Sequence, residues 1–288
     1  MSHHPLIKPW STVASPPFVD STARESVSNG TDIIAPQASV PSFRVLGVSV
    51  HAVQIPDVVF LVERWIEERG SGRFITFTGM HGVTEAHRDP RLKEIHNAAD
   101  LVVPDGMPLV WLGRRHGYPL RRRVYGPEFM ETFCRTTGAR YRHFFYGGAP
   151  GVAEQLAANL QRRYGIGVAG IYAPPFRSLT EEEEDEVAEL VRATAPDLLW
   201  VGLSTPKQER WMHAQRNRLG VPVMLGVGAA FDFHTGRMKQ APAWMRERGL
   251  EWLFRLMAEP RRLWRRYLVG GSRFIWSVSS ELFRLKRL

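Results

Sequence analysis

The sequence lacks features that define several classes of protein. Its 288 residues include one cysteine, Cys134, which alone forms neither an internal disulfide nor a thiolate cluster, so a disulfide-stapled secreted fold is excluded. No segment approaches the ~20 apolar residues that span a bilayer. Residues 1–42 are rich in Ser, Pro and Thr and contain no apolar run of signal-peptide length. We therefore expect a disordered leader on a cytoplasmic protein whose contact with any membrane is peripheral.

Several catalytic motifs are also missing. The chain has no Asp-x-Asp pair to hold a nucleotide-bound divalent cation and no histidine pair at helical ligand spacing. It has no Gly-x-Ser-x-Gly nucleophile motif, and no Gly-x-Gly-x-x-Gly with a following acidic residue, which argues against a dinucleotide oxidoreductase. These absences favour an enzyme without a metal or other cofactor that acts on a phosphate-bearing ligand.

Most of the chain carries no excess charge. The formal net charge is +9, and residues 237–288 contain 13 Lys and Arg against 4 Asp and Glu, so the first 236 residues are balanced. The same C-terminal segment holds four of the nine tryptophans. A neutral body with a basic, aromatic tail implies an anionic partner for the tail, such as lipid headgroups, phosphates or nucleic acid.

The hydrophobic pattern predicts an α/β fold over residues 43–236, with a mostly parallel, Rossmann-like sheet between layers of helices. Short apolar runs alternate with segments of helical periodicity, such as 58–68 and 151–163. The acidic run 181–186 follows Thr180 in a capping-box pattern, which favours a solvated helix start over a metal site. The predicted strands span 44–50, 73–77, 101–103, 143–146, 168–172, 198–202 and 222–227.

Residues 237–288 are predicted to form a helical C-terminal appendage. On an α-helical projection of residues 261–268, the four arginines occupy one arc and the apolar and aromatic residues the opposite one. This pattern is typical of a helix in the membrane interface, and it also fits a surface helix that packs its apolar arc on the body. A surface that stacks on nucleic-acid bases favours aromatics interleaved with cations, so the separation argues against a nucleic-acid partner.

Polar loops follow the predicted strands, where open parallel sheets bind ligands. Thr78 and His81 follow one strand, either as ligand contacts or in a glycine turn with a satisfied histidine. Asp105 follows the next, either as a general base or as part of an Asp-Gly turn.

Three further loops are candidates for phosphate binding. Gly147 and Gly148 begin a run of small residues before a helix, which favours a diphosphate cradle of backbone N–H groups. Lys207 and Gln208, at another helix start, have the length to reach a phosphate or a sugar hydroxyl. Asp232 either accepts from a ribose or sugar hydroxyl or caps the next segment.

Together these loops resemble the WecG/TagA/CpsF family of bacterial glycosyltransferases, over roughly residues 45–268. Similar motifs also surround Gly249–Trp252 and Glu259–Arg262. The matching loop segments are Thr78–Val83, Ala99–Gly106, Phe145–Gly151, Val201–Glu209 and Gly226–Phe233.

The resemblance implies transfer of a sugar from a UDP-sugar to a polyprenyl-diphosphate-linked saccharide, with inversion at the anomeric carbon and without a metal. It implies a hexosyltransferase of exopolysaccharide, teichoic acid or related surface-glycan synthesis, bound to the inner face of the cell membrane. The donor sugar and the oligomeric state stay open.

The resemblance also implies roles for individual residues. Asp105 corresponds to the family's general base, Thr78 to a threonine near the preceding strand end, and Gln208 to the glutamine of Pro-Lys-Gln-Glu. Relatives of the teichoic acid enzyme carry Thr-x-Asn-Pro where this chain has Thr78-Gly79-Met80-His81, so we expect His81 to replace the asparagine. The family's tail brings arginines to the substrate diphosphate, and the candidates here, with a membrane-contacting tryptophan, are Arg255, Arg261, Arg262, Arg265 and Trp264.

Overall fold

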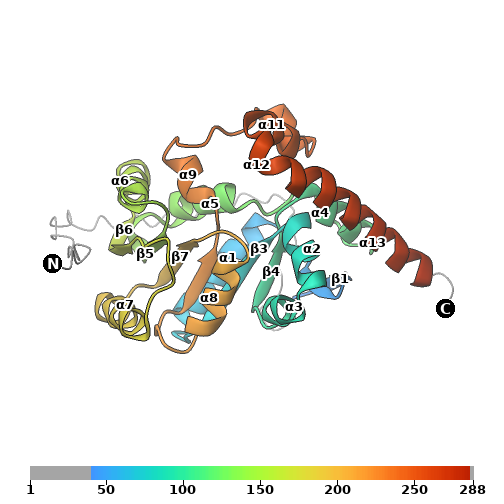
Figure 1. The fold of residues 1–288 in the computed structure, drawn as a ribbon. Coiled ribbons are helices and arrows are strands. Elements are labelled where there is room, and N and C mark those ends of the chain that lie inside the picture. Colours follow the sequence, from blue (N-terminus) through green and yellow to red (C-terminus); the bar gives the residue numbers. More distant parts are fainter. Residues whose placement is uncertain (1–39, 286–288) are drawn as a thin grey trace, which may run out of the picture.

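A computed structural model of the chain describes residues 40–285, so the predicted leader lies almost wholly outside the described residues. Within them, six parallel strands form one sheet in the order β4-β3-β8-β7-β5-β6 (Figure 1). This confirms the predicted parallel α/β fold. The strands are β3 (Arg73–Thr78), β4 (Leu101–Pro104), β5 (Arg142–Gly147), β6 (Gly167–Tyr172), β7 (Leu198–Gly202) and β8 (Val223–Gly226).

Helices cover both faces of this sheet because the strands present apolar side chains to each side. On one face, Phe77, Phe145 and Trp200 pack with α1 (Ile55–Glu67), α5 (Gly126–Thr137) and α6 (Val152–Tyr164). On the other, Phe74, Tyr146 and neighbouring strand residues pack against the helices α3 (Pro90–Asn97), α7 (Glu181–Thr194) and α8 (Lys207–Gln215). Thr180 and Glu183 form the predicted capping box at the start of α7.

The predicted strand 44–50 is wrong, because this segment is a hairpin of β1 (Ser42–Val45) and β2 (Val48–His51). Leu46 and Gly47 both have positive φ, 52° and 86°, which is the geometry of a two-residue turn between antiparallel strands. The apolar alternation continues through the turn, so the hydrophobic pattern does not mark it. The hairpin packs with α2 (Met80–Arg88) and α4 (Met107–Arg115) beside β4.

The end of the chain forms a run of helices, here called the C-terminal helices (residues 243–285). They comprise α10 (Ala243–Glu247), α11 (Glu251–Ala258), α12 (Pro260–Trp264), a π-helical turn (Arg265–Val269) and α13 (Gly270–Leu285). Figure 1 shows α11 and α12 at one end of the molecule and α13 running past α2, with which it is in contact. No helix among residues 40–285 is long and apolar enough to cross a membrane.

The π-helical turn corrects the predicted two-arc helix over residues 261–268. A π-helix places successive residues at a smaller rotation than an α-helix, so a uniform α-helical projection does not hold across this segment. Leu263 is buried at 3% exposure, whereas Trp264 and Leu268 are 43% and 54% exposed. The predicted apolar arc is therefore divided between the protein body and solvent.

Candidate active site

Asp105 lies where the ends of β3 and β4 meet. Its backbone N–H donates to the Thr78 carbonyl oxygen over 3.0 Å, which joins the two loops that leave these strands. Gly79 makes this approach possible, since a Cβ atom there would lie 2.8 Å from the Asp105 carbonyl oxygen. The two loops predicted to carry catalytic side chains are thus in direct contact.

Asp105 lines a cavity of about 200 Å³ between these loops and the C-terminal helices. Burial raises the pKa of Asp105 to about 7, and the negative charge of Glu251 acts in the same direction. Arg123, a hydrogen bond with the Gly126 backbone and Arg255 lower the pKa. A carboxyl that titrates near neutral pH suits proton transfer at physiological pH.

Arg123, Tyr125 and Glu251 lie around Asp105, and no role was assigned to any of them from the sequence, although Glu251 falls within the motif Gly249–Trp252. Arg123 forms an ion pair with Glu251, and the Tyr125 hydroxyl donates to Glu251 Oε1 over 2.6 Å. The Arg123 guanidinium lies 4.1 Å from the centre of the Tyr125 ring. Glu251, the first residue of α11, is only 5% exposed. The place of Glu251 in the motif Gly249–Trp252 was the available signal in the sequence.

The two other predicted catalytic residues differ in position. Thr78 is buried, and its Oγ1 lies 3.3 Å from Thr76 Oγ1 and 3.4 Å from His96 Nδ1, so its hydroxyl belongs to a polar cluster beneath the cavity. Burial lowers the pKa of His96 to about 4, which keeps this cluster neutral. His81, near the start of α2, lines the cavity itself.

The predicted arginines of the C-terminal helices divide between two hollows. Arg255 lines the Asp105 cavity, and its buried Nε has no hydrogen-bond partner within the described part of the chain. Arg265 and Trp264 line a neighbouring hollow of about 590 Å³, which shares His81 with the cavity. Arg261 is exposed and lines neither space, and the side chain of Arg262 lies outside the described residues.

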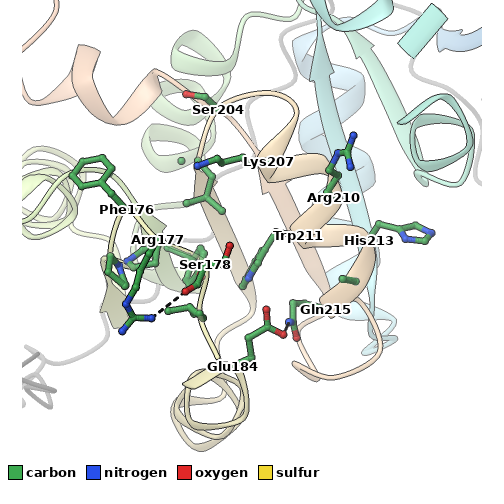
Figure 2. A pocket seen from close by; sticks show the side chains of 18 of the residues that line it. Phe176, Arg177, Ser178, Glu184, Ser204, Lys207, Arg210, Trp211, His213 and Gln215 are labelled. Carbon is green, nitrogen blue, oxygen red and sulfur yellow. Dashed lines mark hydrogen bonds between the residues drawn. The ribbon is translucent and has the colours of Figure 1, made fainter. Parts of the chain in front are cut away.

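Most of the predicted phosphate-binding residues line a different pocket, of about 680 Å³, at the ends of β5 and β7. Gly148, Lys207 and Asp232 all lie there. Figure 2 shows Lys207 and Trp211 of α8 facing Phe176 and Arg177 across this pocket. The Trp211 ring stacks on Tyr146 with centroids 4.0 Å apart, which gives the pocket a flat aromatic wall.

The glycine cradle differs from the prediction in one respect. Gly147 has a φ of 119°, and a Cβ atom there would lie 2.6 Å from the Gly202 carbonyl oxygen, so its backbone is packed against β7. The Gly148 N–H donates to that same carbonyl over 3.1 Å. The single proton of the Gly148 N–H is therefore already donated to a hydrogen bond within the protein.

Gln208 lies beneath the turn that follows β8 and is 2% exposed. Its Nε2 donates to the Gly226 carbonyl oxygen over 2.9 Å and to Glu209 Oε1 over 3.2 Å. These two bonds use both amide protons and fix which way the amide points. Gln208 Oε1 is buried without a hydrogen-bond partner among the residues described.

The loop 203–206 separates the two pockets. Ser204 lines the pocket with Lys207, and the next residue, Thr205, lines the cavity with Asp105. The predicted base and the predicted phosphate-binding residues are thus in adjacent spaces on one edge of the sheet. No group of three or more His, Cys, Asp or Glu side chains within residues 40–285 is arranged to hold a metal ion. The metal-independent reaction stays a prediction.

Comparisons with known proteins identify the chain's relatives. The model of the glycosyl transferase WecG/TagA/CpsF family matches residues 43–288. An N-acetylglucosaminyldiphosphoundecaprenol N-acetyl-beta-D-mannosaminyltransferase of Bacillus spizizenii is 32% identical over 203 residues, which cover 70% of this chain and 77% of the relative. Proteins with the same name from Bacillus subtilis and Staphylococcus aureus are 28% and 26% identical, over 73% and 84% of this chain and 80% and 94% of theirs.

Proposed function

The chain belongs to the WecG/TagA/CpsF family of glycosyltransferases, and from this membership we propose that it transfers a sugar from a UDP-sugar to an undecaprenyl-diphosphate-linked saccharide. The relatives' names support N-acetylmannosamine as the sugar and a diphosphoundecaprenol-linked N-acetylglucosamine as the acceptor. The product would be a precursor of teichoic acid or a related surface glycan.

The observation that carries the proposal is Asp105 in the cavity between the strand ends and the C-terminal helices. With a pKa near 7, the ionised form accepts a proton from the acceptor hydroxyl as that oxygen attacks the anomeric carbon. The new bond forms opposite the breaking bond to UDP, so the configuration at the anomeric carbon inverts. The proton ends on Asp105, and UDP leaves with the electron pair of the broken bond.

The leaving diphosphate needs positive charge near it, because negative charge develops there in the transition state. Lys207 in the adjacent pocket and Arg255 in the cavity are the cations that we assign to this role. The Arg255 Nε has no hydrogen-bond partner among residues 40–285, which supports an anionic ligand, since a buried guanidinium N–H is otherwise unsatisfied. We assign the uridine to the pocket walled by Trp211, with Asp232 on the ribose, and the unpartnered Gln208 oxygen to a ligand hydroxyl.

We further propose that the enzyme acts on the inner face of the cell membrane. Trp264, Leu268, Ile275 and Trp276 of the C-terminal helices are large, apolar and 43–77% exposed. Arg261, Arg265 and Arg273 are exposed on the same helices. This combination suits an anionic lipid surface, where aromatic side chains enter the headgroup region and arginines contact phosphates. The hollow lined by Arg265 is our assignment for the acceptor diphosphate.

An assay of UDP release tests the proposed function. We expect the protein to release UDP from one of UDP-N-acetylmannosamine, its uronic acid or UDP-glucose when a lipid-diphosphate-linked N-acetylglucosamine is present. The rate should rise with pH through about 7, because only the ionised Asp105 accepts a proton. Asp105→Asn should lower the rate by at least about a hundredfold.

Asp100→Asn is the matched control for this assay. Asp100 lies just before the opposite end of β4, where it accepts from the Phe74 N–H over 3.0 Å and pairs with Arg216 over 3.2 Å. Its loss should leave turnover within about twofold, because the pair is partly exposed and remote from the cavity. Absence of acceptor-dependent UDP release from every donor, or near-normal turnover by Asp105→Asn, would refute the proposal.

A further inference from the structure

Two carboxylates and two arginines meet at the Asp105 cavity, but only one ion pair forms among them in the described part of the chain. Arg123 pairs with Glu251, while Asp105 has no carboxylate–cation pair there. Both arginines still act on Asp105 through space, because each lowers its pKa. Arg123 therefore has two possible carboxylate partners, Asp105 and Glu251, and in the structure it pairs with Glu251 of α11.

We propose that Glu251 is a positioning residue that holds Arg123 in an ion pair and so leaves the Asp105 carboxylate free to act as the base. The inference rests on the proposed function and adds to it a role for a residue that acts on the base through Arg123. In this arrangement α11 supplies part of the electrostatic environment of the base as well as a wall of the cavity.

The hydrogen bonds of Glu251 suit this role. One carboxylate oxygen accepts from the Tyr125 hydroxyl over 2.6 Å and the other from Arg123, so both oxygens are fixed. The Arg123 guanidinium also lies against the Tyr125 ring, at 4.1 Å from its centre. Arg123 is thus held by two contacts, one with the Glu251 carboxylate and one with the Tyr125 ring.

The charges near the Asp105 carboxyl also support this role for Glu251. Glu251 raises the pKa of Asp105, and Arg123 lowers it. If Glu251 loses its negative charge, it no longer raises the pKa of Asp105. Arg123 then has the Asp105 carboxylate as its nearby partner, which lowers the same pKa. Both changes make Asp105 a weaker base. The other titratable or charged groups lining this cavity are His81 of α2, Tyr125 before α5, Arg255 of α11 and Tyr267 of the π-helical turn.

Docking of α11 therefore links the tail to the chemistry. With α11 in place, Arg123 is occupied and the base is free. When α11 is displaced, Glu251 no longer lies near Asp105. Arg123 then has no competing carboxylate and becomes the neighbour of the base. A weaker base accepts a proton less readily in the transition state, so the tail affects the chemical step as well as substrate binding.

The test compares Glu251→Gln with the wild-type full chain and with Glu281→Gln. The amide introduced by Glu251→Gln keeps an oxygen for the Tyr125 hydroxyl but removes the charge. Glu281 is a matched control, because it also joins a C-terminal helix to the body, through the Leu46 N–H at 3.1 Å, but it does not line the cavity. Two quantities are measured: kcat against pH, and the titration of Asp105 by NMR of carboxyl-labelled aspartate, assigned with Asp105→Asn.

For Glu251→Gln we expect the acidic limb of the kcat profile and the Asp105 titration to move together to lower pH, by about one pH unit. The plateau value of kcat should fall about tenfold. Glu251→Asp, which restores the charge, should return both midpoints toward the wild type. Glu281→Gln should leave both midpoints unchanged.

An unchanged Asp105 titration in Glu251→Gln overturns the inference, as does a loss of activity with an unmoved pH profile, which would mark a purely structural role. If Glu251→Gln does not fold, Glu251→Asp and its titration decide, because a longer Arg123 contact should move the midpoint by a smaller amount in the same direction. The NMR titration needs no substrate. A shifted titration in a protein that transfers no sugar would thus refute the proposed function and leave the coupling intact.

Discussion

Burial raises the pKa of Asp105 to about 7 from its ordinary value near 4. The folded protein therefore binds this proton more tightly than the unfolded chain does. The free energy of unfolding receives its full benefit below about pH 4 and falls as the pH rises toward 7, where the folded state must hold the carboxylate ionised. The protonation state that suits a base is thus the one that destabilises the fold.

We expect Asp105→Asn to stabilise the protein while removing its activity. The amide keeps an oxygen for the Gly126 N–H but carries no charge that burial opposes. Above about pH 8 the free energy of unfolding should rise by about 4 kcal/mol, and below about pH 4 the gain should vanish. Urea denaturation at both pH values measures this. If Asp105→Asn changes the free energy of unfolding equally at the two pH values, ionisation of Asp105 does not destabilise the folded protein.

At the scale of single residues, sequence reasoning found side chains that follow strands and Arg255 of the C-terminal helices, but assigned no role to Arg123 or Glu251. Asp105, His81 and Lys207 lie at the strand and helix ends where their motifs place them. Arg123 and Glu251 are 128 positions apart, and only the docking of α11 brings them together. A buried ion pair of this kind depends on tertiary packing, so local spacing carries no signal for it.

At the scale of elements, the β-strands of the central sheet were predictable because each is a short, mostly apolar run between helical segments. Five of the six described strands are largely buried, and the edge strand β6 is half-buried. The order of the strands in the sheet was not predictable, since the alternation of strands and helices fits more than one arrangement. The β1–β2 hairpin and the π-helical turn were missed for a different reason. Both change backbone geometry inside a continuous hydrophobic pattern, which reports burial but not a turn at Leu46 or a change of helix type at Arg265.

The end of β5 offers a direct test of close backbone packing. We expect Gly147→Ala to lower the free energy of unfolding by about 3 kcal/mol, because its φ of 119° disfavours a side chain and the new Cβ atom would lie 2.6 Å from the Gly202 oxygen. Gly151→Ala is the control, since its φ is also positive, at 81°, but nothing lies within 4 Å of the added atom. Its cost should be about 1 kcal/mol.

Urea denaturation of the two glycine variants measures the difference. If Gly147→Ala lowers the free energy of unfolding by no more than Gly151→Ala does, backbone conformation alone accounts for both losses. The contact between β5 and β7 would then tolerate a methyl group. A larger cost at Gly147 would support the view that the glycines after β5 serve packing of the sheet edge in addition to any contact with phosphate.

At the scale of the whole molecule, the C-terminal helices have two different sides. Phe274 and Val278 of α13 are buried against the body, whereas Ile275 and Trp276 are 65% and 77% exposed. One helix therefore joins the protein core and presents a hydrophobic surface to solvent. A surface of this kind on a basic segment is the feature on which our membrane assignment depends.

We expect the double variant Ile275→Ser with Trp276→Ser to bind anionic liposomes at least about tenfold more weakly, because two large apolar side chains no longer enter the lipid. Sedimentation with vesicles that contain phosphatidylglycerol measures the binding. Turnover of a short-chain, water-soluble acceptor should change little, since neither residue lines a pocket described above.

Phe176→Ser is the control for this liposome experiment. Phe176 is 86% exposed but belongs to the loop beside α8, remote in sequence from the basic segment. Its loss should leave liposome binding unchanged. Equal weakening by Phe176→Ser would mean that general surface hydrophobicity drives the binding, and unchanged binding by the double variant would remove α13 from the membrane contact.

The contact between Glu281 and Leu46 joins the last helix of the described chain to its first strands. During synthesis the hairpin leaves the ribosome long before α13, so the apolar side of the hairpin lacks Phe274 and Val278 until that helix has been made. The Asp105 cavity likewise lacks Glu251 and Arg255 until α11 has been made. A nascent chain that has already formed its sheet therefore has no finished cavity around Asp105 until α11 has been made and has docked.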